Sequence, residues 1–146
     1  MEEGKNLSRV INPESAGRER TRLIKSIVLA LRELMRQTEP DELSKDLTAF
    51  VVLALQDIHN SIDSSVTAWE KRGYWVKADR FRMEWDWTSR ASNQLKEALL
   101  TENWPDVAVH SAYVMQKFFN IQVPVRHRLG TPWIGAFKKL IDHSKN

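Results

Sequence analysis

The chain has 146 residues, no cysteine and a formal net charge of +3 at pH 7. This length favours one domain with a real hydrophobic core, and the lack of cysteine excludes disulfides, thiolate metal ligands and a cysteine nucleophile. The longest uncharged apolar run, Ala49 to Leu55, is far shorter than the roughly 20 residues of a membrane span. Since the polar start also lacks a secretory signal, we expect a cytoplasmic protein that does not enter a membrane.

Charge is distributed unevenly along the chain. Residues 1–38 hold eight Lys and Arg against five Asp and Glu, residues 39–116 eight against thirteen, and residues 117–146 six against one, which gives +3, −5 and +5. Basic ends around an acidic middle favour an anionic partner at the C-terminal end, or contact between the ends of one molecule and the middle of another. The alternative is that the basic side chains simply solvate the surface.

The N-terminal half predicts an arm and two long helices. Residues 1–13 have no helical pattern, so we expect a flexible arm there and a single helical domain over residues 14–146. Apolar residues spaced three and four apart predict a helix from about Glu14 to Gln37. A second helix is expected to begin at Thr38-Glu39-Pro40-Asp41, with capping-box-like spacing, and to stop at Gly73.

The C-terminal half predicts two further long helices and a short one. One runs from about Tyr74 to Leu100, and the next starts at Asn103-Trp104-Pro105-Asp106 and ends near Asn120. A last helix is expected to start at Thr131-Pro132. Short connections make neighbouring helices antiparallel, so the prediction is an all-α, up-down-up-down four-helix bundle with a short C-terminal fifth helix packed across one end.

The six tryptophans fall within these helical patterns or at their boundaries, which indicates either a wide core or a contact surface. The second helix is apolar almost all round at residues 51–55 and needs cover on more than one side. A four-helix monomer does not obviously supply that cover. We therefore expect a homodimer through the stripe from Phe50 to Ile62, with Trp69 or Trp87 at its edge.

Catalytic chemistry has little support in the sequence, and we assign no catalytic residue, metal or cofactor. His59 with Asp63 and Asp106 with His110 are each four residues apart, so two facing helices could bring them together. Both histidines lie at the flanks of their helices, however, and we expect no bound metal. The serines lack a nucleophile elbow and the glycines lack the spacing of a phosphate loop.

The basic C-terminal segment has the most functional content. Two arginines and a histidine precede the expected helix start, whose backbone N–H groups would add to their field around a phosphate or carboxylate. Aromatic and lysine side chains follow, which could stack on bases or contact a protein. The candidate residues for anion or partner binding are Arg126, His127, Arg128, Thr131, Trp133, Lys138 and Lys139.

Two alternatives stay open for this segment. The aromatic residues have the spacing of a helix core, with the lysines on its solvated back face, and Arg126 and Arg128 could instead pair with Glu97 or Glu102 as a structural clamp. The first helix carries a second basic strip at Arg18, Arg22, Lys25, Arg32 and Arg36. If this strip met the C-terminal loop, the two would form a continuous positive groove.

The stretch from Trp75 to Phe119 is loosely similar to the helical HEPN domains of prokaryotic toxin and nucleotide-binding proteins. The arginine-x(4–6)-histidine signature of their ribonuclease members occurs at none of the four histidines, and residues 1–70 do not follow the pattern. The resemblance therefore assigns no family. The sequence favours a non-enzymatic interaction or scaffold protein that self-associates, and the alternative is a nucleic-acid-associated or nucleotide-handling protein that uses its basic ends.

Overall fold

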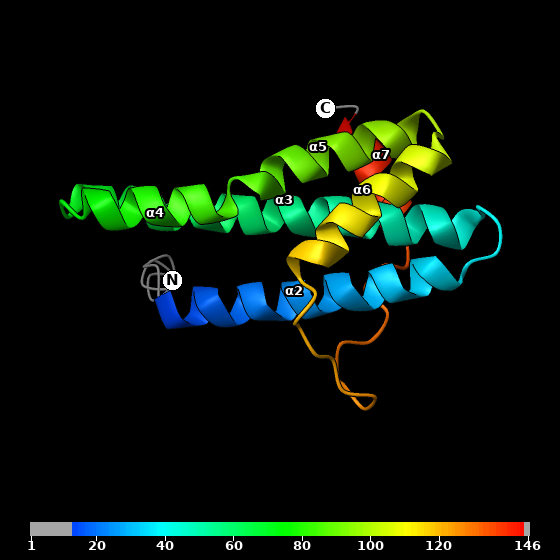
Figure 1. Ribbon diagram of the computed structural model, residues 1–146, viewed down its shortest axis with the longest axis horizontal. Helices are drawn as coiled ribbons and strands as arrows, with labels where there is room; N and C mark the ends of the chain where they lie inside the picture. The colour runs from blue at the N-terminus through cyan, green and yellow to red at the C-terminus, as the bar shows by residue number, and fades with distance from the viewer. Residues whose placement is uncertain (1–12, 145–146) are drawn as a thin grey trace, which may run out of the picture.

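The computed structural model describes residues 13–144, all of whose regular elements are helices (Figure 1). They are α2 (Pro13–Arg36), α3 (Glu42–Lys71), α4 (Trp75–Trp85), α5 (Trp87–Leu100), α6 (Trp104–Lys117) and α7 (Ala136–Ser144). The predicted all-α bundle with a short C-terminal helix is confirmed. The expected arm lies outside the described residues, except for Pro13, which begins α2. In the described part of the chain, no helix is both long and apolar enough to span a membrane.

α3 is the central element of the bundle, and α2, α4, α5 and α7 all pack against it. Its apolar side chains Leu47, Val51, Leu55, Ile58 and Ile62 are buried, and Phe50 and Leu53 between them are partly buried. Most of the stripe from Phe50 to Ile62, which the sequence suggested as a dimer interface, is thus already covered within one chain, and the expected homodimer stays a prediction. α7 supplies the cover that a plain four-helix arrangement lacks.

Capping hydrogen bonds at both ends of α3 explain where this helix begins and ends. The Asp41 carboxylate accepts a hydrogen bond from the Ser44 backbone N–H at 2.8 Å, so Asp41 is the N-cap and the predicted capping box at Thr38 does not form. At the other end, Gly73 has a φ of +81° and its N–H bonds to the Glu70 carbonyl, while the Tyr74 N–H bonds to that of Trp69. This Schellman motif confirms the predicted stop.

The predicted third helix, Tyr74 to Leu100, is two helices that bend at Asp86 (Figure 1). Asp86 keeps right-handed helical dihedral angles, and the Thr88 hydroxyl donates to the Trp85 carbonyl at 2.7 Å. Hydroxyls that bond back onto the helix backbone bend helices. The bend lets α5 pack on α3, with the Ser92 hydroxyl donating to the Val52 carbonyl at 3.0 Å, while α4 follows the C-terminal half of α3.

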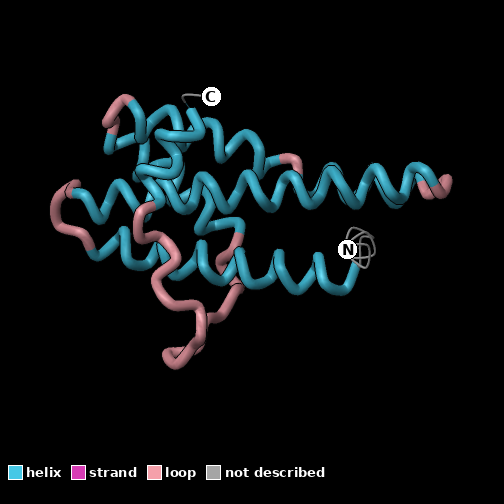
Figure 2. Tube along the Cα trace, turned by 180° about the vertical axis from the view of Figure 1, so that it is seen from behind, coloured by secondary structure: helices cyan, strands magenta, loops and turns pink. Residues whose placement is uncertain are grey.

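The connection between α6 and α7 projects past α2, and its two legs pass on opposite sides of that helix (Figures 1 and 2). α6 crosses between α5 and α2, and α7 packs on α3. The fold thus places the basic loop of this connection beside α2 and leaves α6 as an outer helix of the bundle.

Candidate functional site

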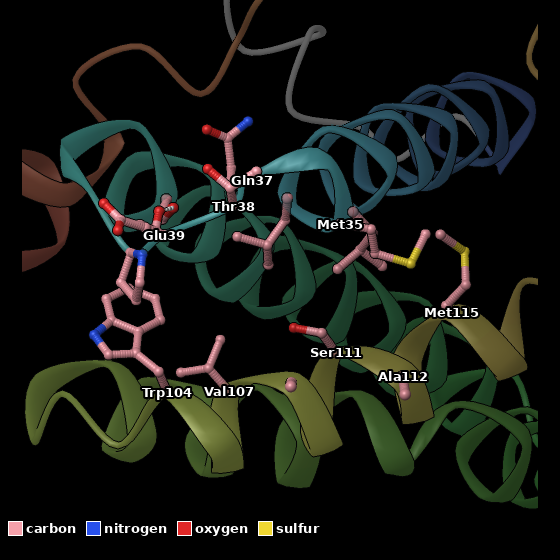
Figure 3. A pocket seen from close by; sticks show the side chains of 14 residues that line it. Met35, Gln37, Thr38, Glu39, Trp104, Val107, Ser111, Ala112 and Met115 are labelled. Atoms are coloured by element: carbon pink, nitrogen blue, oxygen red, sulfur yellow. Dashed lines mark hydrogen bonds between the residues drawn. The ribbon is translucent and has the colours of Figure 1, made fainter.

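An apolar groove of about 360 Å³ lies between α2, the α2–α3 connection and α6 (Figure 3). We call it the α2–α6 groove. It is lined by Leu31, Leu34, Met35, Gln37, Thr38, Glu39, Pro40, Ser44, Trp104, Val107, Ala108, Ser111, Ala112 and Met115. Its volume and its mostly apolar walls with a few polar groups are typical of small-molecule sites, which range over roughly 300–1,000 Å³.

The groove exists because α6 does not fill the space beside α2. α6 packs mainly on α5 and contacts α2 far less. Val107 and Val114 of α6 are buried, whereas Ala108 and Ala112, which line the groove, are exposed and too small to fill the space. Met35, at the end of the predicted α2 stripe, is consequently 68% exposed rather than covered by a partner helix.

A buried hydroxyl lies in the middle of this groove. Ser111 is 8% exposed, and its Oγ has no hydrogen-bond partner among the described residues. In Figure 3 this oxygen points away from the α6 ribbon, toward the space between α6 and the start of α3. Leaving a buried polar group unpaired costs about 1–3 kcal/mol, so a bound group that accepts a hydrogen bond from Ser111 would recover this cost.

The two ends of the groove differ in chemistry. Glu39 and Trp104 lie at one end, and Met35 and Met115 lie at the other (Figure 3). Among the described residues that line the groove, Glu39 has the single charged side chain, and none is Lys, Arg or His. The groove therefore combines an apolar, polarisable end with an acidic end, with Ser111 between them.

The predicted basic site is only partly assembled. Arg126, His127 and Arg128 are all exposed on the projecting loop, where the Leu129 N–H donates to Nδ1 of His127 at 3.2 Å. Neither arginine forms an ion pair within the described part of the chain, so the clamp with Glu97 or Glu102 does not form.

The expected helix start at Thr131 is wrong, since α7 begins at Ala136 and residues 132–135 form a turn. The Asp46 carboxylate of α3 accepts hydrogen bonds from the Gly135 N–H at 3.1 Å and from the Phe137 N–H at 2.9 Å. An internal carboxylate thus occupies the anion-binding end of this helix. These N–H groups are not available to an external phosphate at Thr131.

Of the remaining candidate binding residues in this segment, one is buried in the core and two are exposed on the surface. Trp133 is buried and cannot stack on a base, whereas Lys138 and Lys139 are exposed on α7. Lys138 pairs with Asp142 at 3.0 Å. Partial burial raises the pKa of Asp57 on α3, and the positive charge of Lys139 opposes that rise, so part of the basic charge of α7 faces an acidic neighbour.

The projecting loop touches the basic strip of α2 through one apolar residue. Leu129 of the projecting loop shares a shallow hollow with the first turns of α2, which contribute Gly17, Arg18, Thr21, Arg22 and Lys25. Arg22 is paired with Glu19, which raises its pKa and neutralises part of the strip. The cations that line the hollow all come from α2, and the C-terminal loop contributes only the apolar Leu129, so the continuous positive groove that the sequence left open is not formed by the residues of this hollow.

The histidine and carboxylate pairs stay apart. His59 contacts Asp63 within α3 at 3.6 Å, while His110 borders a separate hollow on α5 and α6 together with Asp106. Residues 13–144 contain no group of three or more His, Asp or Glu side chains arranged to hold a metal ion. The convergence that a mixed site would require does not occur in this part of the chain.

Comparison of the chain with protein-family models, curated proteins and solved structures finds no match. The assignment of the candidate site is therefore based on the geometry of this structure alone. Sequence reasoning missed the α2–α6 groove, although a signal exists in the spacing of Trp104, Ala108, Ala112 and Met115, which places small residues in the middle of an apolar face of α6. That signal has meaning only once α6 is known to face α2.

Proposed function

We propose that this protein is a non-enzymatic interaction module that holds an apolar ligand or partner group in the α2–α6 groove. The observation that carries the proposal is the unpaired hydroxyl of Ser111, buried in the wall of an otherwise apolar groove. Such a combination of apolar walls with one placed polar group fixes the orientation of a bound molecule. Because Ser111 has no hydrogen-bond partner within residues 13–144, no base in this part of the chain is positioned to activate it as a nucleophile.

The test is binding of the neutral apolar dye Nile red, followed by its fluorescence. We expect saturable binding to the wild type and its loss in Ala112→Phe, which places a ring in the groove. Val109→Phe is the matched control, because Val109 lies exposed on the same helix and does not line the groove. Equal binding by the wild type and Ala112→Phe, or no saturable binding at all, would contradict the proposal.

A second candidate function is weak binding of anions or nucleic acid by the basic surface. The observation that favours it is the hollow shared by Leu129 and the basic start of α2, together with the exposed Arg126 and Arg128 on the same loop as Leu129. Phosphate neutralisation makes affinity fall steeply with salt. Replacing Arg126 and Arg128 by Gln should lower the salt slope of single-stranded DNA binding by about 2, or about 1 per phosphate contact; affinity that is insensitive to salt would exclude this function.

Self-association remains part of the proposal, with a different surface from the one the sequence suggested. The outer face of α6 exposes Val109 and Tyr113 four residues apart, and Phe119 follows the helix with 80% exposure. Exposed apolar side chains gathered on one helix are typical of contact surfaces. This face is distinct from the groove, so a dimer through it leaves the groove accessible.

A further inference from the structure

The α2–α6 groove also restricts the kind of molecule that it can hold. Its volume of about 360 Å³ is that of a small-molecule site. An inserted helix of another protein would present apolar side chains, with its backbone carbonyls turned inward and already bonded along the helix. It would leave the Ser111 hydroxyl unpaired, whereas a small molecule can bring an acceptor oxygen within reach of it.

Charge excludes one large class of small amphiphiles. Fatty acids and other anions would bring a carboxylate or phosphate into a groove whose described lining holds no cation and one carboxylate, that of Glu39. An unpaired anion in an apolar site carries a large desolvation cost. A positive group at the same end would meet the Glu39 carboxylate and the ring of Trp104, and aromatic faces attract ammonium groups.

The opposite end suits an apolar tail. Met35 and Met115 lie there, and methionine side chains are flexible and polarisable enough to adapt to tails of different shape (Figure 3). Resting on the proposed function of this groove, we propose that its ligand is a small amphiphile with an apolar tail at the methionine end, a hydrogen-bond acceptor beside Ser111 and a positive charge at the Glu39 end.

The experiment uses the full chain and three probes with the same alkyl tail: decyltrimethylammonium, decanol and decanoate. Each is titrated as a competitor of bound Nile red. We expect decyltrimethylammonium to displace the dye most tightly, decanol to follow, and decanoate to be at least about tenfold weaker than the cation, because burying an unpaired carboxylate beside Glu39 is costly.

Two pairs of variants assign these differences to residues. Glu39→Gln should lower the affinity for decyltrimethylammonium about threefold, a small effect because a partly exposed ion pair contributes little, and should leave the affinity for decanol unchanged. The control is Glu42→Gln, three residues away and outside the groove, which should change the affinity for neither probe. Ser111→Ala should lower the affinity for decanol about fivefold, which corresponds to the loss of one hydrogen bond. It should leave the affinity for decyltrimethylammonium unchanged, because that probe has no hydrogen-bond acceptor.

Ser26→Ala is the matched control for Ser111→Ala. The Ser26 hydroxyl is likewise buried and has no hydrogen-bond partner among the residues that the structure describes, but it does not line the groove, so its removal should change no affinity. Circular dichroism checks that each variant folds, and Ser111→Thr, which retains the hydroxyl, should keep decanol binding.

Decanoate binding as tightly as the cation, or unchanged affinities in Glu39→Gln and Ser111→Ala, would overturn this inference. In that case the loss of Nile red binding in the Ala112→Phe variant would still support the groove as a binding site. Nile red binding that survives Ala112→Phe would overturn the proposed function itself, and the ligand class with it.

Discussion

Asp46 shows how one side chain can decide the use of a whole segment. Its carboxylate lies at the N-terminus of α7 and accepts hydrogen bonds from two backbone N–H groups that are 89 and 91 residues away along the chain. The N–H groups at a helix start need such partners, and a carboxylate also matches the positive end of the helix dipole. The pairing holds α7 on α3 and removes the helix start from the surface that could bind anions.

Replacing Asp46 by Ala should lower the free energy of unfolding by about 1–2 kcal/mol, as the loss of a helix cap does. Chemical denaturation monitored by circular dichroism measures this change. The control is Asp63→Ala, because Asp63 is exposed and makes only a long contact with His59; it should stay within about 0.5 kcal/mol of the wild type. Equal effects of the two substitutions would show that Asp46 does not stabilise α7.

Glu102 stores backbone strain at the end of α5. Its φ of +54° is left-handed, and the adjacent bonds from Glu102 N–H to the Leu99 carbonyl and from Asn103 N–H to the Ala98 carbonyl form a Schellman motif. Glycine adopts this conformation without a clash. Glu102→Gly should therefore raise the free energy of unfolding by about 1 kcal/mol.

Thr101→Gly, in the same turn, provides the matched control for Glu102→Gly. Thr101 has a φ of −94° and its hydroxyl donates to the Glu97 carbonyl at 2.8 Å, so glycine there should destabilise the protein. Both variants are compared by thermal unfolding. A lower midpoint for Glu102→Gly than for the wild type would mean that the carboxylate of Glu102 outweighs the backbone strain.

At the scale of elements, α7 is the helix that completes the burial of α3. Four helices alone would leave one side of α3 open, which is why the sequence suggested a second copy as its cover. In the structure, α7 and the turn before it bring Trp133, Ala136 and Leu140 into the core. The same aromatic residue that could have stacked on a base is therefore a packing residue.

Trp133→Ala should lower the free energy of unfolding by about 3–5 kcal/mol, the usual effect of removing a buried large aromatic side chain. Hydrogen exchange should show the largest loss of protection in α7 and in the part of α3 that it covers. The neighbouring Ile134 is 68% exposed, and Ile134→Ala should change stability by less than about 0.5 kcal/mol. A loss below about 1 kcal/mol in Trp133→Ala would contradict the core position of this ring.

At the scale of the whole molecule, we expect a dimer through the outer face of α6. Sedimentation at tens of micromolar, in the usual range of specific association, should detect it. Val109→Glu combined with Tyr113→Glu should yield folded monomer, because both side chains are exposed. In contrast, Ile58→Asp should unfold the chain, since it buries an unpaired charge in the core. A strict monomer for the wild type would overturn the dimer.

The local chemistry of the sequence determined most of the helices. Apolar spacing placed α2, α3 and α6, and the caps at Asn103 and Gly73 fixed two boundaries that the structure reproduces. These features were predictable because helix periodicity and caps depend on neighbours within a few residues. The bend at Asp86 and the N-cap at Asp41 were missed, since each depends on one competing hydroxyl or carboxylate contact.

Only the tertiary structure decided how these helices are used. The sequence shows Ala108, Ser111 and Ala112 as ordinary small residues of α6, and a groove arises from them only because α6 stands beside α2 without filling the space. Likewise, Asp46 reaches the start of α7 and Leu129 reaches the start of α2 through packing between residues far apart in sequence. Local periodicity fixes which face of a helix is apolar, but the neighbour that covers that face, or leaves it open, is set by long-range packing.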